Sequence, residues 1–301
     1  LELEDVSASA ESGLTSIALD PKFDANGWVY LAYASDTRDA TALRIARFRE
    51  REGVLGQGAL VARERANAAE HVTIRFGADG KLYAGVGAGS DPRAAQSLSS
   101  PHGKILRLNP DGSTPRDNPR NLPTFTTGHR EPRALASQPT TNVLWELDRD
   151  RDRGDELNML VSGADYGWPT AIAADASVPP GLVLPPGTDV SAASFVPGPS
   201  ASPLAGELLI ASAGTNDLLR VRFGANGKPV VVEGLVHGHY GRLSAVAVAA
   251  DGTVYVATSN DETWGRGQDV VGGDERLRRY GDDSRHGHGQ RTRQRLHERE
   301  R

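Results

Sequence analysis

The sequence predicts an all-β fold of the β-propeller type, built from short antiparallel sheets that repeat along the chain. The main observation is an internal repeat in which an apolar strand, a glycine-containing turn and a strand of the form apolar-Tyr-apolar follow one another. Clear copies cover residues 17–35, 74–87 and 246–259, a weaker copy covers 135–148, and a fifth unit fits at 207–223. Units of this length are typical of propeller blades.

Turn residues and composition favour the same fold class. The pairs Asp79–Gly80, Asn226–Gly227 and Asp251–Gly252 suit tight hairpins, because both central residues of such turns can adopt positive φ. The chain contains 34 glycines and 18 prolines, and helical runs are scarce between its short Val/Ile/Leu/Tyr strands. Together these features predict a succession of antiparallel hairpins.

The sequence divides into a propeller domain, residues 1–280, and a short tail. Residues 281–301 contain a single aliphatic residue, Leu296, and an excess of Arg, His and Gln. Such a segment cannot bury enough apolar surface to fold, so we expect a disordered basic tail that is solvated. The chain starts at Leu1 without a methionine or a signal-like segment, and we expect it to be a mature or truncated piece.

Charge and composition exclude several classes of function. The net charge of −5 gives no reason to expect nucleic acid as a partner. The absence of cysteine excludes disulfides and thiolate metal sites. No stretch is long and apolar enough to span a membrane. A glycine-rich phosphate loop after a strand and a serine-centred hydrolase elbow are also absent from the sequence.

Several irregular motifs occur together in a fixed order. They are GLTSIALDPKF at Gly13–Phe23, AAQSLSSPHGKILRLNPDGSTPRDNP at Ala94–Pro119, GHREPRAL at Gly128–Leu135 and GDELNMLVSGADYGWP at Gly154–Pro169. In this order they resemble the soluble quinoprotein sugar dehydrogenases, the glucose/sorbosone dehydrogenase family that uses pyrroloquinoline quinone (PQQ). The resemblance covers roughly Glu11 to Tyr280 and implies a six-bladed propeller. Because the repeat gives five units, we expect the first blade to be missing or incomplete.

The resemblance implies an oxidoreductase that oxidises aldose sugars by hydride transfer to PQQ and passes electrons to an external acceptor. It implies a histidine general base just before the strand IRFGADGKLY, which is His71 here. A strand-end histidine with a satisfied hydrogen bond is the alternative for this residue. The family also implies a periplasmic or secreted location. For the whole chain, the alternative is a catalytically degenerate propeller that binds carbohydrate or protein.

Cofactor contacts follow from the same resemblance. The family's Arg-Asn-Pro-Gln, which contacts the quinone, aligns with residues 130–133, and the planar fork of Arg130 suits the carboxylates of PQQ. Glu131 in place of asparagine is unfavourable beside an anionic ligand, whereas Arg133 in place of glutamine offsets it. The further cofactor contacts that the resemblance implies are Glu11 and Arg242, the latter from a Gly-Arg-x-Arg motif whose second arginine is Ser244 here.

The resemblance also implies calcium, whose ligands are carboxylate and carbonyl oxygens. Glu156 and the carbonyl of Tyr166 would hold a structural ion. A second ion, which polarises the quinone as a Lewis acid, is bound in relatives by the carbonyls of a Gly-Pro pair that aligns with Asp150 and Arg151. The run DRDRDRG at Asp148–Gly154 superficially resembles an acidic calcium loop, but its glycine comes one place too late and no acidic residue closes it. A solvent-facing ladder of arginine and aspartate is the alternative.

Overall fold

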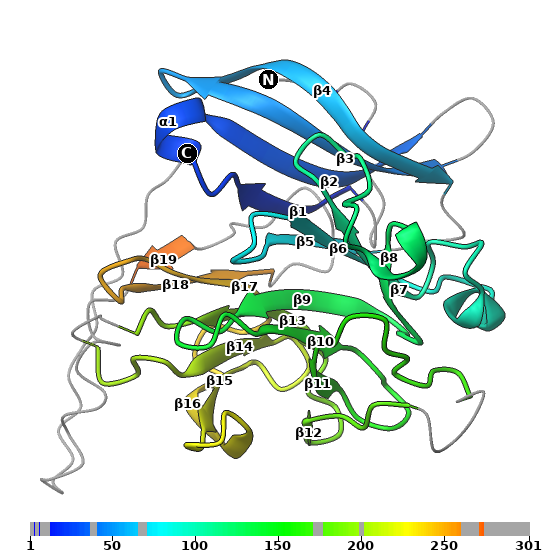
Figure 1. The fold of residues 1–301 in the computed structure, drawn as a ribbon. Helices are drawn as coiled ribbons and strands as arrows, with labels where there is room; N and C mark the ends of the chain where they lie inside the picture. The colour runs from blue at the N-terminus through cyan, green and yellow to red at the C-terminus, as the bar shows by residue number, and fades with distance from the viewer. Residues whose placement is uncertain are drawn as a thin grey trace, which may run out of the picture. The chain divides into compact units, whose positions relative to one another are not determined.

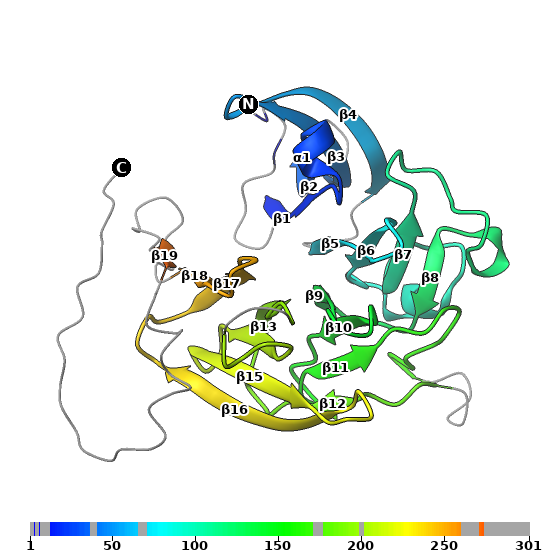
Figure 2. The ribbon, with the colours of Figure 1, turned by 60° about the vertical axis from the view of Figure 1, so that its left-hand side comes forward.

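The computed structural model describes residues 3, 6, 13–36, 41–65, 71–170, 177–198, 202–259 and 271–273, almost all of whose regular structure is β-strand (Figures 1 and 2). Glu11 and the predicted tail lie outside these residues. The chain separates into two compact units. Unit 1 comprises Leu1–Ser137 and Asn142–Pro186, and unit 2 comprises Gln138–Thr141 and Gly187–Arg301.

Unit 1 contains three four-stranded antiparallel sheets in which each strand pairs with its neighbour in the sequence. The first sheet holds β1 (Leu14–Leu19), β2 (Trp28–Asp36), β3 (Thr41–Arg51) and β4 (Val54–Arg65). The second holds β5 (Val72–Phe76), β6 (Leu82–Val86), β7 (Lys104–Leu108) and β8 (Thr124–Thr127). The third holds β9 (Pro132–Ser137), β10 (Leu144–Asp148), β11 (Glu156–Met159) and β12 (Leu182–Val183). Short helices α1 (Phe23–Asn26), η1 (Pro92–Gln96) and η2 (Pro119–Asn121) occupy the loops.

The first strands of these three sheets lie next to one another, since β5 contacts both β1 and β9. Figure 2 shows β5, β6, β7 and β8 following one another outward from this position. Side chains fasten the first strands together. The hydroxyl of Thr15 in β1 donates to the carbonyl of Val72 in β5 at 2.8 Å, and the Ile74 N–H donates to the hydroxyl of Ser16 at 3.0 Å. These two hydrogen bonds hold the start of β5, and with it the preceding residue His71, against β1.

Unit 2 repeats the same pattern in two sheets. One holds β13 (Val190–Phe195), β14 (Leu208–Ser212), β15 (Asp217–Phe223) and β16 (Pro229–His237). The other holds β17 (Leu243–Val248), β18 (Val254–Thr258) and β19 (Val271–Gly273). Here too the first strands, β13 and β17, lie side by side.

The described residues thus form five sheets, which confirms the five units counted in the sequence. Four of the repeat copies fall on the first two strands of a sheet. The copy at residues 207–223 instead covers β14 and β15, the second and third strands of its sheet. The first strand of that sheet, β13, was missed because a long loop rather than a glycine turn separates it from β14.

The predicted hairpin turns are present, but their backbone geometry differs from the prediction. Only the glycine adopts positive φ, at 69° for Gly80, and the preceding Asp79 does not. The Gly80 N–H donates to the Gly77 carbonyl at 3.0 Å and the Gly77 N–H donates to the Lys81 carbonyl at 2.9 Å. This is a three-residue hairpin loop, a type I turn followed by a left-handed glycine. The turns at Gly227 and Gly252 have the same hydrogen bonds.

Apolar packing between sheets fixes the strands that carry the site. One buried cluster joins the first and second sheets of unit 1, with Tyr30 and Phe76 packed edge to face at 5.0 Å. A second cluster joins the second and third sheets, and its buried members are Tyr83, Ile105, Leu135 and Leu144. Burial of such side chains is worth about 2 kcal/mol each. The positions of β5 and β9 relative to each other therefore follow from the core.

The motif GKILR has a structural explanation. Lys104 is fully buried, and its Nζ donates to the carbonyl oxygens of Ala94, Ala95 and His102 at 2.7, 2.8 and 2.9 Å. Burial lowers the pKa of Lys104 to about 8. The three carbonyls satisfy the three donors of its ammonium group, so this lysine anchors η1 to β7.

Candidate functional site

The candidate site lies in unit 1, where β6 ends and where the segments leading into β5 and β9 meet. Gly87 follows β6, and its N–H donates to the carbonyl of His71 at 3.3 Å. The next residue, Ala88, donates its N–H to the carbonyl of Arg130 at 2.9 Å. A β-carbon on Gly87 would lie 3.8 Å from the His71 carbonyl and 4.0 Å from Cγ of Glu131. The backbone therefore brings together His71 and Arg130–Glu131, which are far apart in the sequence.

His71 is held neutral by its surroundings. Burial and the guanidinium groups of Arg133 and Arg149 lower the pKa of His71, backbone groups of Pro132 and Thr15 oppose the shift, and the net pKa is about 3. Among the described residues, Nδ1 of His71 is enclosed and makes no hydrogen bond, while backbone groups of Pro132 and Thr15 act on the ring, so the choice between a general base and a strand-end histidine stays a prediction. The lowered pKa keeps the imidazole unprotonated at neutral pH, which is the form that a general base requires, whereas the neighbouring cations oppose its protonation.

Glu131 sits at the centre of two ion pairs. Arg149 donates from Nε and Nη2 to its two carboxylate oxygens at 2.7 and 2.6 Å, and Arg133 also donates to Oε1. The predicted compensation of Glu131 by Arg133 is therefore present. Arg149 was missed by sequence reasoning, because it was counted only as part of the charged run. Its approach to Glu131 depends on the pairing of β9 with β10, which the sequence does not display.

Arg130 is engaged by acidic residues of the same chain. Its Nη1 donates to Asp150 Oδ1 and to Asp152 Oδ2, the latter at 2.8 Å. Burial lowers the pKa of Arg130, but the carboxylates of Asp152 and Asp150 outweigh it and the net shift is upward. The guanidinium remains about one third exposed. A tricarboxylate ligand would therefore compete with two aspartates for this arginine.

The charged run at residues 148–154 is only partly a solvent-facing ladder. Asp148 and Asp150 are buried, at 4% and 3% exposure, whereas Arg151 and the side chain of Asp152 are exposed. Asp150 accepts backbone N–H groups of Asp152 and Arg153 at 3.0 and 3.1 Å. The ladder prediction is therefore wrong for the first half of the run, because its aspartates satisfy backbone donors.

The two irregular motifs of the sequence interlock. The Tyr166 N–H donates to the Thr127 carbonyl at 2.9 Å, and the Trp168 N–H donates to the Gly128 carbonyl at 3.0 Å. The side chain of Gln96 donates to Asp165 Oδ1 and to the Trp168 carbonyl, both at 2.9 Å. Docking of these loops positions the segment that begins at Gly128 and carries Arg130 and Glu131.

A second group of polar side chains is buried beside this segment and was not predicted from the sequence. Its members are His129, Glu146, Asp148 and Asn158. Nδ1 of His129 lies 3.5 Å from Glu146 Oε1 and 3.9 Å from Asp148 Oδ2. Burial lowers the pKa of His129 to about 4 and raises the pKa of Glu146 and of Asp148 well above the usual values.

The two predicted ligands of a structural calcium lie near this group. Glu156 is the first residue of β11 and pairs with Asp148 in register, and burial raises its pKa. The ring of Tyr166 stacks on His129 with centroids 4.8 Å apart, and its hydroxyl donates to the Met159 carbonyl at 2.5 Å. Glu156 also acts electrostatically on His129. The region therefore holds both residues, and their joint coordination of an ion stays a prediction.

The remaining predicted cofactor contacts lie elsewhere. Arg242 belongs to unit 2, directly before β17, where its carbonyl accepts the Ser259 N–H at 2.9 Å. Glu11 lies outside the described residues. Asp150 accepts the Gly154 N–H on its carbonyl at 2.9 Å, so this predicted ligand of the second calcium already has one donor.

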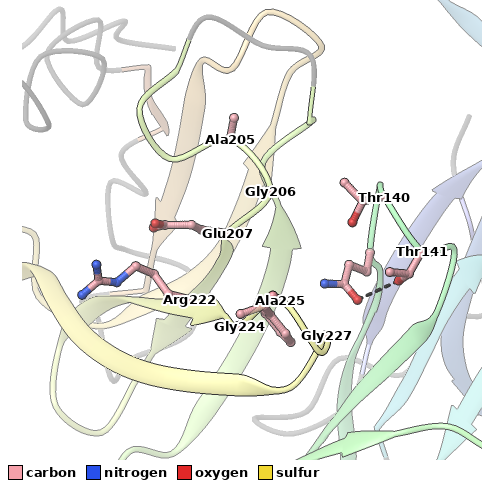
Figure 3. Close-up of a pocket in the computed structure, with 11 residues that line it drawn as sticks. Thr140, Thr141, Ala205, Gly206, Glu207, Arg222, Gly224, Ala225 and Gly227 are labelled. Carbon is pink, nitrogen blue, oxygen red and sulfur yellow. Dashed lines mark hydrogen bonds between the residues drawn. The ribbon is translucent and has the colours of Figure 1, made fainter.

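Unit 2 contains an open pocket of its own (Figure 3). Glu207 and Arg222 lie on one side of it, and Thr140 and Thr141 lie on the other. None of the predicted site residues lines it. We therefore keep the candidate site in the region of His71.

Comparison with known proteins agrees with the sequence motifs. The profile of the family described as Glucose / Sorbosone dehydrogenase matches residues 1–265. The chain belongs to this family. Its five described sheets are blades of the β-propeller fold of the glucose/sorbosone dehydrogenases. Within the described residues, no helix is long and apolar enough to cross a membrane.

Several known proteins resemble the chain to different degrees. The PQQ-bound aldose sugar dehydrogenase of Streptomyces coelicolor is 28% identical and matches with a TM-score of 0.77, over 90% of this chain and 81% of that one. An uncharacterised Synechocystis protein is 34% identical over 182 residues, or 54% of this chain and 44% of that protein. The aldose sugar dehydrogenase of Escherichia coli is 29% identical over 180 residues, or 56% and 48%. The chain spans about half the length of these curated relatives.

Proposed function

We propose that this protein is a PQQ-dependent aldose sugar dehydrogenase with its active site at His71. The observation that carries the proposal is the placement of His71 beside residues 130–133 around Gly87, in a positive field from Arg133 and Arg149. Family membership and the likeness to a PQQ-bound aldose sugar dehydrogenase support the choice of cofactor and substrate class.

His71 is the general base of the proposed reaction. When bound, PQQ supplies the electrophile that accepts hydride from the sugar carbon. The hydroxyl proton of the same carbon passes to His71, and we assign this role to Nε2 because Nδ1 is enclosed. The lowered pKa of His71 leaves its imidazole unprotonated at neutral pH, and the negative charge of a bound tricarboxylate would favour its protonation during the reaction. An external electron acceptor would be needed to reoxidise the cofactor.

The arginines beside His71 fit a ligand that carries several carboxylates. Arg130, Arg133 and Arg149 place three planar guanidinium groups there, and each can bind a carboxylate through two N–H groups. The two charged side chains that act most strongly on His71 are cations, so the field favours an anion. Glu11 and Arg242 complete the proposed set of cofactor contacts.

Calcium belongs to the same proposal. Glu156 and the Tyr166 carbonyl would hold a structural ion, and the backbone carbonyls of Asp150 and Arg151 would hold the ion next to the quinone. Oxygen ligands of this kind suit calcium. The raised pKa of Glu156 reflects a half-buried carboxylate that a cation would stabilise in its charged form. We also place the protein in the periplasm or outside the cell, by analogy with its family.

A second candidate function is a propeller that binds carbohydrate or protein without a quinone. The specific observation in its favour is the engagement of Arg130 by Asp150 and Asp152, and of Arg133 and Arg149 by Glu131. These acidic residues reduce the positive charge available to a cofactor. The two candidates differ in whether the protein turns over sugar.

The test is a dye-linked assay of the protein with added PQQ and calcium on several aldoses. We expect turnover in wild type, loss of at least about a hundredfold in His71→Asn, and normal turnover in His237→Asn. His237 is a suitable control because its side chain is 72% exposed and lies in unit 2. Absence of turnover from folded protein under these conditions contradicts the proposal and favours the binding module.

A further inference from the structure

The buried group around His129 has ligand atoms without hydrogen-bond partners. His129, Glu146 and Asn158 each have 0% exposure. Within the described part of the chain, Nδ1 of His129, Oε1 of Glu146 and Oδ1 of Asn158 are buried atoms that make no hydrogen bond. Leaving such atoms unsatisfied costs about 1–3 kcal/mol each, more for charged groups. Three in one small region indicate that something else satisfies them.

The sheet register places these side chains on one face. Glu146 and Asp148 are two residues apart on β10, so both point to the same side of the third sheet. Asn158 pairs with Glu146 across the strands, and its Nδ2 donates to Glu146 Oε2 at 3.0 Å. His129 reaches the same face from the segment before β9. Three of these side chains offer one candidate ligand atom each, and the three atoms all lie within 4.8 Å of one another. The three residues are His129, Glu146 and Asp148.

The distances suit a shared ion better than direct hydrogen bonds. His129 Nδ1 is 3.5 Å from Glu146 Oε1 and 3.9 Å from Asp148 Oδ2, which are long for hydrogen bonds. Two ligand atoms that each lie about 2.1 Å from one metal ion at a tetrahedral angle are about 3.4 Å apart. The two distances from His129 Nδ1 are close to this value.

The surrounding groups orient the side chains as they do around metal ligands. Nε2 of His129 lies 2.8 Å from the hydroxyl of Thr126, which leaves Nδ1 available as the ligand atom. Stacking on Tyr166 fixes the plane of the ring. Asp148 accepts the N–H groups of Arg130 and Glu131 at 2.8 and 2.5 Å, and such donors favour an ionised carboxylate.

Charge and ligand chemistry define the class of ion. A divalent cation would neutralise the charge of two buried carboxylates that ionise to bind it. Imidazole nitrogen with carboxylate oxygen suits zinc and its first-row neighbours, whereas calcium takes oxygen ligands. We propose that His129, Glu146 and Asp148 bind one divalent first-row transition-metal ion, with the Asn158 amide oxygen beside it. Its ligands differ from Glu156 and the Tyr166 carbonyl, the neighbouring groups proposed to bind calcium, and the proposal does not depend on the dehydrogenase activity.

The proposed ion would have a structural role. It would connect β10 to His129, the residue directly before Arg130, and so brace the segment that faces His71. Because the site forms only in the folded chain, binding adds directly to the stability of the fold. Removal of the metal should therefore loosen the segment that precedes β9.

The test uses metal-depleted protein titrated with Zn²⁺, followed by calorimetry and thermal unfolding, and with Co²⁺, followed by visible absorption. We expect one equivalent of Zn²⁺, a raised Tm, and a Co²⁺ spectrum of a low-symmetry site. Glu146→Gln preserves an acceptor for Asn158, and His129→Phe preserves the stacking on Tyr166. Each should weaken Zn²⁺ binding by a hundredfold or more.

Two matched variants serve as controls. Glu207→Gln changes a carboxylate of unit 2 whose Oε2 makes no hydrogen bond and lies 3.6 Å from Nη1 of Arg220, and it should leave Zn²⁺ affinity unchanged. Glu156→Gln should reduce stabilisation by Ca²⁺ while Zn²⁺ still binds. Anomalous scattering from Zn²⁺-soaked wild-type crystals locates the ion without any variant. The proposal is overturned if wild type binds no Zn²⁺, if the ion lies away from His129, or if folded Glu146→Gln and His129→Phe retain wild-type affinity.

Discussion

Arg149 donates two hydrogen bonds to Glu131, from Nε at 2.7 Å and from Nη2 at 2.6 Å. This fork occupies both oxygens of a carboxylate next to His71, at a position where the resemblance implies an uncharged asparagine. The pair links β9 to the end of β10 and also sets the charge that a quinone would meet. A substitution of Glu131 should therefore have two effects, one on the stability of the fold and one on quinone binding, which can be measured independently.

Glu131→Gln should strengthen quinone binding and weaken the fold. Loss of a like charge next to the proposed carboxylate site should lower the Kd for PQQ about tenfold, equivalent to about 1.4 kcal/mol. Loss of the ion pairs with Arg133 and Arg149 should cost about 2 kcal/mol of unfolding free energy. Fluorescence titration and urea denaturation measure the two effects. The control is Glu233→Gln, which disrupts the ion pairs with Arg220 and Arg222 in unit 2. An unchanged or weaker quinone affinity in Glu131→Gln would count against the assigned site.

Gly128→Ala should disrupt the interlocked loops. Gly128 has φ of 79°, and a β-carbon there would collide with Asp165 Oδ1 and with the backbone nitrogens of Tyr166 and Gly167. We expect a loss of more than about 3 kcal/mol in unfolding free energy. Gly227→Ala is the matched control, because φ is 73° and no atom lies within 4 Å of the added carbon. It should cost only about 1 kcal/mol from backbone strain. Equal losses in the two variants would show that the loop contact is unimportant.

The neutral state of His71 should make stability depend on pH. The folded-state pKa of about 3 lies below the unfolded value near 6.5, so the unfolded chain binds the proton first. Stability therefore falls as the pH drops below 6.5, and the fall continues to about pH 3. Relative to His71→Asn, wild type should lose about 2 kcal/mol between pH 7.5 and pH 5. Urea denaturation of both proteins at several pH values tests this, and parallel pH profiles would contradict it.

The sequence predicted those features that depend on local pattern. Alternating apolar strands and glycine turns predicted the five sheets, since a hairpin is specified by neighbouring residues. The hairpin at Gly80 formed with a different turn geometry, because Asp79 accepts the Lys81 N–H instead of adopting positive φ. The placement of His71 near Arg130 came from the family resemblance and not from any local signal.

Features that depend on strand register were not predicted. The approach of Arg149 to Glu131 requires the pairing of β9 with β10, and the group around His129 requires three chain segments to meet. One signal in the sequence was overlooked. Glu146 and Asp148 alternate with apolar residues on a strand whose residues are all buried, so their side chains share one interior face.

The most direct measurement is the affinity of the protein for PQQ, with calcium present, in wild type, His71→Ala and Arg130→Ala. The account predicts that wild type and His71→Ala bind the quinone within about twofold of each other, because arginines hold the carboxylates. Arg130→Ala should bind about tenfold more weakly or worse, with its far-ultraviolet circular dichroism unchanged. Failure of folded wild type to bind the quinone, or equal loss of binding in the two variants, would contradict the account.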